Sequence, residues 1–250
     1  MKHTDVIKQE YISQYTETHK IFYRTLSKMI SDISFIEACA NLQDPDIEYD
    51  WITIKHLHGS VFENLIMRTY RCFFDNRDPD STNIFKFKNS VIGSFLKEEY
   101  VEVIKSQVTQ LPIEDKIYRK TKLNALQKNL LKLRDMYIGH EQLNPPDAEV
   151  SLSEIRDLVY RGIELFQILS FEPKSFYDPL LEGDGYDFSK EISYTKKSMA
   201  EFLRYSVLSS NLIQEVSIAL SPECEGQIAK RIMRVVDDIN ISKQHEDKNI

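Results

Sequence analysis

The stretch that decides the fold is EDKIYRKTKLNALQKNLLKLRDMYIGH, residues 114–140. Six residues of this stretch, called the seam below, recur at alternating steps of three and four, which is the spacing of a stripe along one face of an α-helix. The seam positions are Leu123, Leu126, Leu130, Leu133, Tyr137 and His140. This spacing predicts one long helix over about 114–140 that packs against another helix, and Pro145-Pro146 provides a stop after it.

The same helical period extends along most of the chain, and patterns typical of strands are almost absent. Glycine and proline are scarce, at 7 and 8 in 250 residues, so long helices meet few interruptions. Ser151 and Glu154 form an S-x-x-E capping box that predicts a helix start. The expected helices are 5–41, 50–74, 90–108, 114–140, 151–170, 189–206, 209–220 and 221–239. The fold class is therefore all-α, an up-and-down helical bundle with a helical C-terminal extension.

The composition changes over residues 171–186, where proline, glycine and aspartate become frequent. Such a segment is typical of a hinge or of a boundary between structural units. We therefore expect a helical bundle over residues 1–186 and a C-terminal helical extension over residues 187–250 that packs on the bundle.

The overall charge is acidic, with a formal net charge of −7 and a pI near 5.5. Proteins that coat nucleic acid or anionic membranes without selectivity are usually basic, so that class is disfavoured. The first residues, MKHTDVIKQEYISQYTETHK, hold no signal-peptide core, and no window has the ~18 apolar residues of a membrane span. Cys39, Cys72 and Cys224 are far apart and odd in number, which favours reduced thiols. We expect a cytoplasmic protein outside the membrane.

A local basic run departs from this acidic average. No acidic residue occurs between Lys116 and Arg134. The basic residues of the run are Lys116, Arg119, Lys120, Lys122, Lys128, Lys132 and Arg134. An electropositive stripe of this kind is suited to a phosphodiester substrate, although a basic run can also be an ordinary solvated face.

The end of the run carries the strongest candidate for chemistry. At about 100° per residue, Arg134, Tyr137 and His140 fall within an arc of roughly 120°, with Asp135 at the flank of the arginine. A guanidinium can hold a phosphate bidentately, and an imidazole can move protons near neutral pH. The structural alternative is that the histidine interacts with the helix dipole and that the arginine and aspartate form a surface ion pair.

The predicted helix over 50–74 offers further candidates. Arg68 occupies an apolar register, where an unpaired charge would be costly. It either pairs with an acid across the bundle, which we favour, or lines a cleft with Arg134. His56 and His58 point about 200° apart on a helix, so they cannot easily share a metal ion.

The segment LRDMYIGH, residues 133–140, resembles the signature of the HEPN superfamily (higher eukaryotes and prokaryotes nucleotide-binding domains). That signature is an arginine, commonly followed by a polar residue, and then a histidine near the end of a long helix. More narrowly, the chain resembles the AbiU-type, abortive-infection branch through YRCFFDNRDPDSTNIFKF at 70–87 and SLSEIRDLVYRGIELFQIL at 151–169. The likeness in layout covers roughly residues 10–205.

This resemblance implies a metal-independent endoribonuclease of the kind found among toxins and antiviral effectors. An RNA 2′-hydroxyl would attack the neighbouring phosphate and leave a 2′,3′-cyclic phosphate. The resemblance implies His140 as general acid/base, Arg134 as the residue that binds phosphate in the transition state, and Asp135 as the polar residue that orients one of them. The candidate substrate-binding residues are Lys128, Lys132, Tyr137 and Arg68.

The same resemblance implies RNA as a partner and a homodimer in which two motifs face a shared cleft. It implies no metal and no other cofactor, and an antitoxin or other protein partner is a further expectation. A second hypothesis belongs to a different class: a non-catalytic helical scaffold that binds a protein partner or a nucleotide. The acidic charge and the catalytically inert members of the superfamily support it. An accessible pair of Arg134 and His140 would favour the nuclease, and a separated or inaccessible pair would favour the scaffold.

Overall fold

The computed structural model describes residues 3–40, 51–76, 83–139, 148–171, 192–193 and 195–199. Within these ranges the chain is almost entirely helical and contains no strand, so the all-α fold class is confirmed. The helical elements are α1 (His3–Val6), η1 (Gln9–Tyr11), α2 (Ile12–Ala40), α3 (Trp51–Phe73), α4 (Ile84–Ser90), η2 (Val91–Phe95), α5 (Glu98–Thr109), η3 (Pro112–Glu114), α6 (Lys116–Tyr118), η4 (Arg119–Leu123), α7 (Asn124–Gly139) and α8 (Leu152–Ile168).

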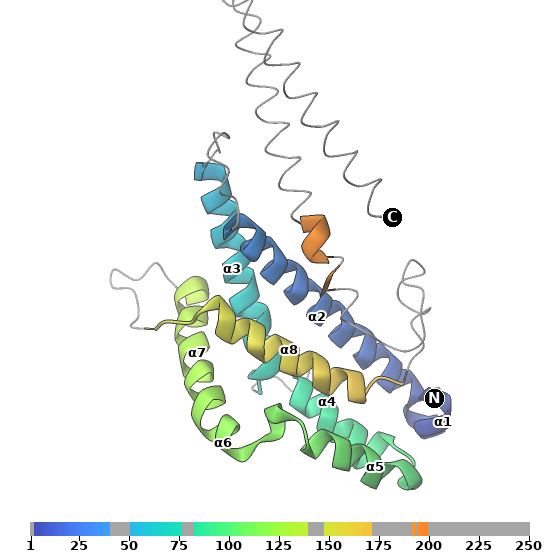
Figure 1. Ribbon diagram of the computed structural model, residues 1–250. Coiled ribbons are helices and arrows are strands. Elements are labelled where there is room, and N and C mark those ends of the chain that lie inside the picture. Colours follow the sequence, from blue (N-terminus) through green and yellow to red (C-terminus); the bar gives the residue numbers. More distant parts are fainter. Residues whose placement is uncertain are drawn as a thin grey trace, which may run out of the picture.

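The bundle is organised around α2 and α3, the two longest of these helices (Figure 1). α2 packs along α3, α7 packs on α3, and α8 packs on α2. α4, α5 and α6 lie together at one end of the bundle. The expected C-terminal helices lie outside the described residues except for 192–193 and 195–199.

The N-terminal helix begins later than the periodicity predicts. The expected helix over 5–41 is divided into α1, η1 and α2. The cause is a backbone pairing with a distant segment, because the Lys8 amide donates to the Phe95 carbonyl at 2.8 Å and the Lys97 amide donates to the Val6 carbonyl at 3.0 Å. These amides and carbonyls are committed to the pairing, so the helix cannot run through residues 6–8.

Two expected helices contain a π-helical turn. The helix expected over 90–108 is instead α4, the π-helical η2 and, after a break at Leu96, α5. The helix expected over 114–140 is α6, the π-helical η4 and α7, and it starts where the Asp115 side chain accepts a hydrogen bond from the Tyr118 amide. The predicted seam is confirmed in its described part. Its buried members are Leu123, Leu126, Leu130 and Leu133.

The capping box at the start of α8 is confirmed. The Glu154 amide donates to the Ser151 hydroxyl at 3.2 Å, and the Ser151 amide donates to the Glu154 carboxylate at 2.8 Å. These two bonds satisfy backbone donors that a helix start would otherwise leave without partners. The sequence pattern therefore located this helix start correctly.

Gly162 allows α8 to approach the end of α3. A Cβ atom built on Gly162 would collide with the Phe73 ring, at 2.7 Å from its Cε1 atom and closer still to Cζ. Phe73 is only 2% exposed, so its ring has little room to move aside. The glycine is therefore required here by packing, because any side chain would push the two helices apart.

We predict that Gly162→Ala destabilises the fold by about 1–3 kcal/mol, because overpacking outweighs the gain in helix propensity. Gly59→Ala is the matched control, since no atom lies within 4 Å of a Cβ built there. It should leave stability unchanged or raise it by up to about 1 kcal/mol. Chemical denaturation measures both variants, and equal stability of the two would contradict the packing role of Gly162.

His19 is a buried polar residue at the contact between α2 and the end of α8. Its Nε2 atom lies 2.8 Å from the Ser170 hydroxyl, which itself donates to the Phe166 carbonyl at 2.8 Å. Its ring stacks on Phe166 with a centroid distance of 4.5 Å. Burial, with a smaller effect of the charge on His3, lowers the pKa of His19 to about 3. The imidazole is therefore neutral in the folded state at neutral pH.

We predict that this histidine makes the fold sensitive to acid. Because its pKa is lowered on folding, its contribution is complete above pH ~6.5 and is lost as the pH falls from there towards 3. In this window the free energy of unfolding should fall by about 1.4 kcal/mol per pH unit more in the wild type than in His19→Gln. Denaturation at a series of pH values tests this, and parallel slopes for the two proteins would refute it.

Glu37 connects the described part of the region after residue 191 to the bundle. Its carboxylate on α2 accepts from Arg156 of α8 at 2.7 Å and from Lys196 at 3.2 Å. Burial acts to raise the pKa of Glu37, but the hydrogen bonds of the two cations outweigh it and lower that pKa. Ile192 is partly buried and packs against the hydrophobic core. The predicted boundary at residue 186 lies outside the described residues.

Candidate functional site

The candidate site lies at the C-terminal half of α7. The structure describes Arg134 and Asp135 fully, whereas His140 and the side chain of Tyr137 lie outside the described residues. α7 packs against α3, so residues of α3 form the surroundings of the described part of the site.

Arg134 is held by two groups. The Asp135 Oδ1 atom accepts from Nε at 2.9 Å and also from an Nη atom of the same guanidinium. The guanidinium carbon lies 4.4 Å from the centroid of the Tyr70 ring, within range of a cation–π interaction. The Arg134 side chain is 15% exposed and that of Asp135 is 58% exposed. Arg134 and Asp135 therefore form an ion pair, and the guanidinium of this pair packs on an aromatic ring of α3.

Tyr70 belongs to the surroundings of the candidate site, and the sequence patterns did not identify it. It is 3% exposed and lies 64 positions before Arg134 in the sequence. No spacing rule links residues that distant in the chain. The available signal was its position two residues after Arg68 in the same predicted helix. Its contact with Arg134 also needs the antiparallel pairing of α3 and α7, which only the fold reveals.

Lys128 and Lys132 are exposed and occupy one face of α7, because residues four apart lie above each other on a helix. Asp135 follows three positions later on the same face. The side-chain amide of Asn129 donates to the Glu149 backbone carbonyl at 2.9 Å, which brings the segment before α8 back against α7. The exposed face of α7 therefore combines the two lysines with one carboxylate at its end.

Arg68 pairs with Asp32 of α2, the ion-pair alternative considered for it. The side chains are 34% and 15% exposed. Burial raises the pKa of the Asp32 carboxyl in spite of the hydrogen bond and charge of Arg68, which act to lower it. The pair compensates a charge in an apolar register. A role of Arg68 in binding substrate stays a prediction.

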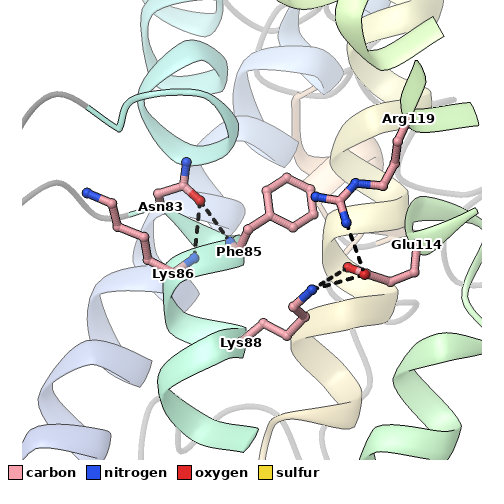
Figure 2. A network of polar contacts seen from close by, with 6 residues as sticks. All are labelled: Asn83, Phe85, Lys86, Lys88, Glu114 and Arg119. Carbon is pink, nitrogen blue, oxygen red and sulfur yellow. Dashed lines mark hydrogen bonds and ion pairs between the residues drawn. The ribbon is translucent and has the colours of Figure 1, made fainter. Parts of the chain in front are cut away.

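The start of the basic run belongs to a different network, which Figure 2 shows. The Glu114 carboxylate accepts from Lys88 at 2.9 and 3.0 Å and from Arg119 at 3.2 Å. Both cations also lie over the Phe85 ring, with Arg119 4.9 Å and Lys88 5.7 Å from its centroid. Asn83 caps α4 beside this network by accepting from the amides of Phe85 and of the next residue.

This network removes Arg119 from the electropositive stripe that the sequence predicts. Arg119 is bound to a carboxylate that stands just before the run, and both Glu114 and Lys88 are only 12% exposed at the side chain. The network joins α4 to the turn between α5 and α6. Its position in the fold indicates a structural role, and the basic residues left on α7 are those nearer the candidate site.

We predict that Glu114→Gln destabilises the fold by about 1–3 kcal/mol, because it leaves the mostly buried Lys88 ammonium without a counter-charge. Glu102→Gln is the matched control, since Glu102 pairs with Lys105 at 3.5 Å with both side chains exposed. It should change stability by less than about 1 kcal/mol. Thermal unfolding of both variants tests this, and a neutral Glu114→Gln would contradict the role of the network.

Other kinds of site find no support in the described ranges. No three His, Cys, Asp or Glu side chains gather there in an arrangement that could hold a metal ion. Cys39 and Cys72 are free and buried, and burial raises the pKa of both thiols. No helix in these ranges has the length and apolar character that a membrane span requires.

Comparisons of the chain with protein-family models, with curated proteins and with solved structures find no match. The resemblance to the HEPN superfamily therefore rests on the residues and layout given above.

Proposed function

We propose that this chain is a HEPN-type, metal-independent endoribonuclease of the AbiU-type branch. The observation that carries the proposal is the state of Arg134, which Asp135 and Tyr70 hold in a fixed orientation within the segment LRDMYIGH. A fixed guanidinium costs little reorganisation when it stabilises charge that develops on a phosphate. The second support is the pair of exposed lysines, Lys128 and Lys132, on the same helix.

In the proposed reaction, the RNA 2′-oxygen bonds to the adjacent phosphorus while the bond from phosphorus to the 5′-oxygen breaks. The products are a 2′,3′-cyclic phosphate and a 5′-hydroxyl. His140 would take the proton from the 2′-hydroxyl or give one to the departing 5′-oxygen. Arg134 would stabilise the charge on the phosphate oxygens, and Asp135 would orient the guanidinium.

The remaining predicted residues would bind the strand. Lys128 and Lys132 would neutralise neighbouring phosphates, which supports binding even though the whole chain carries a net charge of −7. Tyr137 would lie beside the scissile region and Arg68 at its margin. The proposal includes a cytoplasmic homodimer in which two motifs share a cleft, with a role as a toxin or in abortive infection and an antitoxin or other protein as regulator.

A second function, a non-catalytic helical scaffold that binds a protein partner or a nucleotide, has one observation in its favour. The charge and one face of the Arg134 guanidinium are already satisfied within the chain, and the side chain is 15% exposed. An arginine that only clamps α7 to α3 would look the same. The two functions differ in whether replacing His140 abolishes a reaction.

We predict that the purified full-length protein cleaves mixed RNA in the presence of EDTA and leaves 2′,3′-cyclic phosphate ends. His140→Ala should lower the rate by about 10²–10⁴-fold, because a general acid/base contributes that much. His56→Ala, an exposed histidine of α3, is the matched control and should cleave like the wild type. The rate and the product ends are measured together with folding by circular dichroism.

The outcomes separate the two functions. A loss of less than about threefold in folded His140→Ala would refute the role of that histidine. No cleavage by any folded variant, wild type included, would favour the scaffold, and the search would turn to protein and nucleotide partners.

A further inference from the structure

The hydrogen bonds of Arg134 divide its guanidinium into an occupied edge and an open edge. A guanidinium carries five N–H donors in one plane. Asp135 accepts from Nε and from the Nη2 atom on the same edge. Among the described residues no other acceptor contacts the guanidinium. The end formed by Nη1 and Nη2 therefore keeps a pair of parallel N–H groups, which is the geometry that binds two oxygens of one phosphate.

Tyr70 fixes the plane in which this open edge lies. Its ring is 3% exposed and packs against Phe74, with a centroid distance of 6.2 Å, at the end of α3. A ring enclosed in this way cannot turn aside when a ligand approaches. With the ring on one face and Asp135 on one edge, the guanidinium has little freedom except to present its remaining edge.

A similar arrangement elsewhere in the bundle shows what is particular to Arg134. Arg161 of α8 donates through Nε to Asp157 at 2.9 Å and lies 4.5 Å from the centroid of the Tyr118 ring. Two carboxylates act on it, because Glu164 adds to the effect of Asp157 and together they raise the pKa of Arg161. Arg161 is therefore under the influence of two carboxylates.

Arg134, by contrast, is paired with a single carboxylate within the described ranges and follows the exposed lysines of α7. Lys132 precedes it by two positions and Lys128 by six. Among the described residues, an anion that approaches Arg134 therefore meets one carboxylate, whereas an anion that approaches Arg161 meets two. Of these two Arg–Tyr pairs, the pair on α7 is the better anchor for a phosphate.

We propose that Tyr70 is the positioning residue of Arg134, and that the open Nη1–Nη2 edge it orients anchors one phosphate of an RNA strand. This inference rests on the proposed function and adds to it the residue and the edge that hold the substrate. Tyr70 acts through Arg134 and does not touch the reacting atoms. Asp135 orients the guanidinium and at the same time weakens phosphate binding through its own charge.

The test uses the full chain and a fluorescent 2′-O-methyl RNA oligonucleotide, which cannot be cleaved because the attacking hydroxyl is blocked. Tyr70→Leu should weaken binding by about 3- to 10-fold, the range of a partly desolvated cation–π contact. Tyr70→Phe keeps the ring and should bind within about twofold of the wild type. Tyr118→Leu, which removes the ring beneath Arg161, is the matched control and should not change binding.

The salt dependence distinguishes positioning from loss of charge. Arg134→Ala should reduce the slope of log affinity against log salt by about 0.7, the value for one lost phosphate contact on a single strand. Tyr70→Leu should keep the wild-type slope, because the charge of Arg134 remains. Asp135→Asn keeps an acceptor for Nε but removes the charge, so it should tighten binding by about 2- to 5-fold.

Several outcomes would overturn the inference. They are absence of oligonucleotide binding by the wild type, wild-type binding by folded Tyr70→Leu, and equal weakening by Tyr70→Leu and Tyr118→Leu. If Tyr70→Leu does not fold, an unchanged salt slope in folded Arg134→Ala overturns it instead. Parallel assays with unmodified RNA separate the two proposals. If the Tyr70 and Arg134 variants lose binding but the wild type does not cleave RNA, the anchor is retained and the nuclease is rejected. If the wild type cleaves RNA and Tyr70→Leu cleaves it equally well, the nuclease is retained and the anchor is rejected.

Discussion

The close approach of α3 and α8 at Phe73 and Gly162 is the constraint on which the candidate site depends. The ring of Phe73 lies against the backbone of α8, and no side chain at residue 162 could share that space. Tyr70 lies one turn earlier on α3, so the contact that fixes Phe73 also fixes the height and rotation of the ring beneath Arg134. The orientation of the partly buried Arg134 side chain is thus set by packing in the interior of the bundle.

The parts of the fold that could be predicted from the sequence are those encoded by residues close together in the chain. The stripe that ends in Leu130 and Leu133 and the capping box of Ser151 with Glu154 both depend on spacings within a few residues, and the structure confirms both. The interruption before α2 could not be found in this way. It requires the backbone at Lys8 to meet that at Phe95, a pairing that no local period encodes.

The same distinction between contacts of close residues and contacts of distant residues holds for the candidate site. Arg134 and Asp135 are sequence neighbours, so their pairing could be expected, and Arg68 needed a partner because it stands in an apolar register. The sequence could not say that this partner is Asp32, or that Tyr70 lies under Arg134, because both contacts join different helices. The count of basic residues also placed Arg119 in the predicted electropositive stripe, although Glu114, just before the run, pairs with Arg119. Charge counted along a chain is therefore a poor guide to charge on a surface when the carboxylates flanking the run are left out.

The π-helical turn η4 has a further consequence for the rod formed by α6 and α7. A π-helical turn accommodates an additional residue in a helix, and that residue rotates everything before it by about 100° relative to everything after it. The parts of the helix before and after η4, α6 and α7, are consequently rotated relative to each other. Arg119, the first residue of η4, contacts Glu114 and Phe85, whereas α7 after the π-helical turn directs its leucines inward and Arg134 to Tyr70. One helical segment can thereby meet two differently placed neighbours, and the shortening of η4 by one residue would bring the parts before and after it into phase and separate one of them from its contacts.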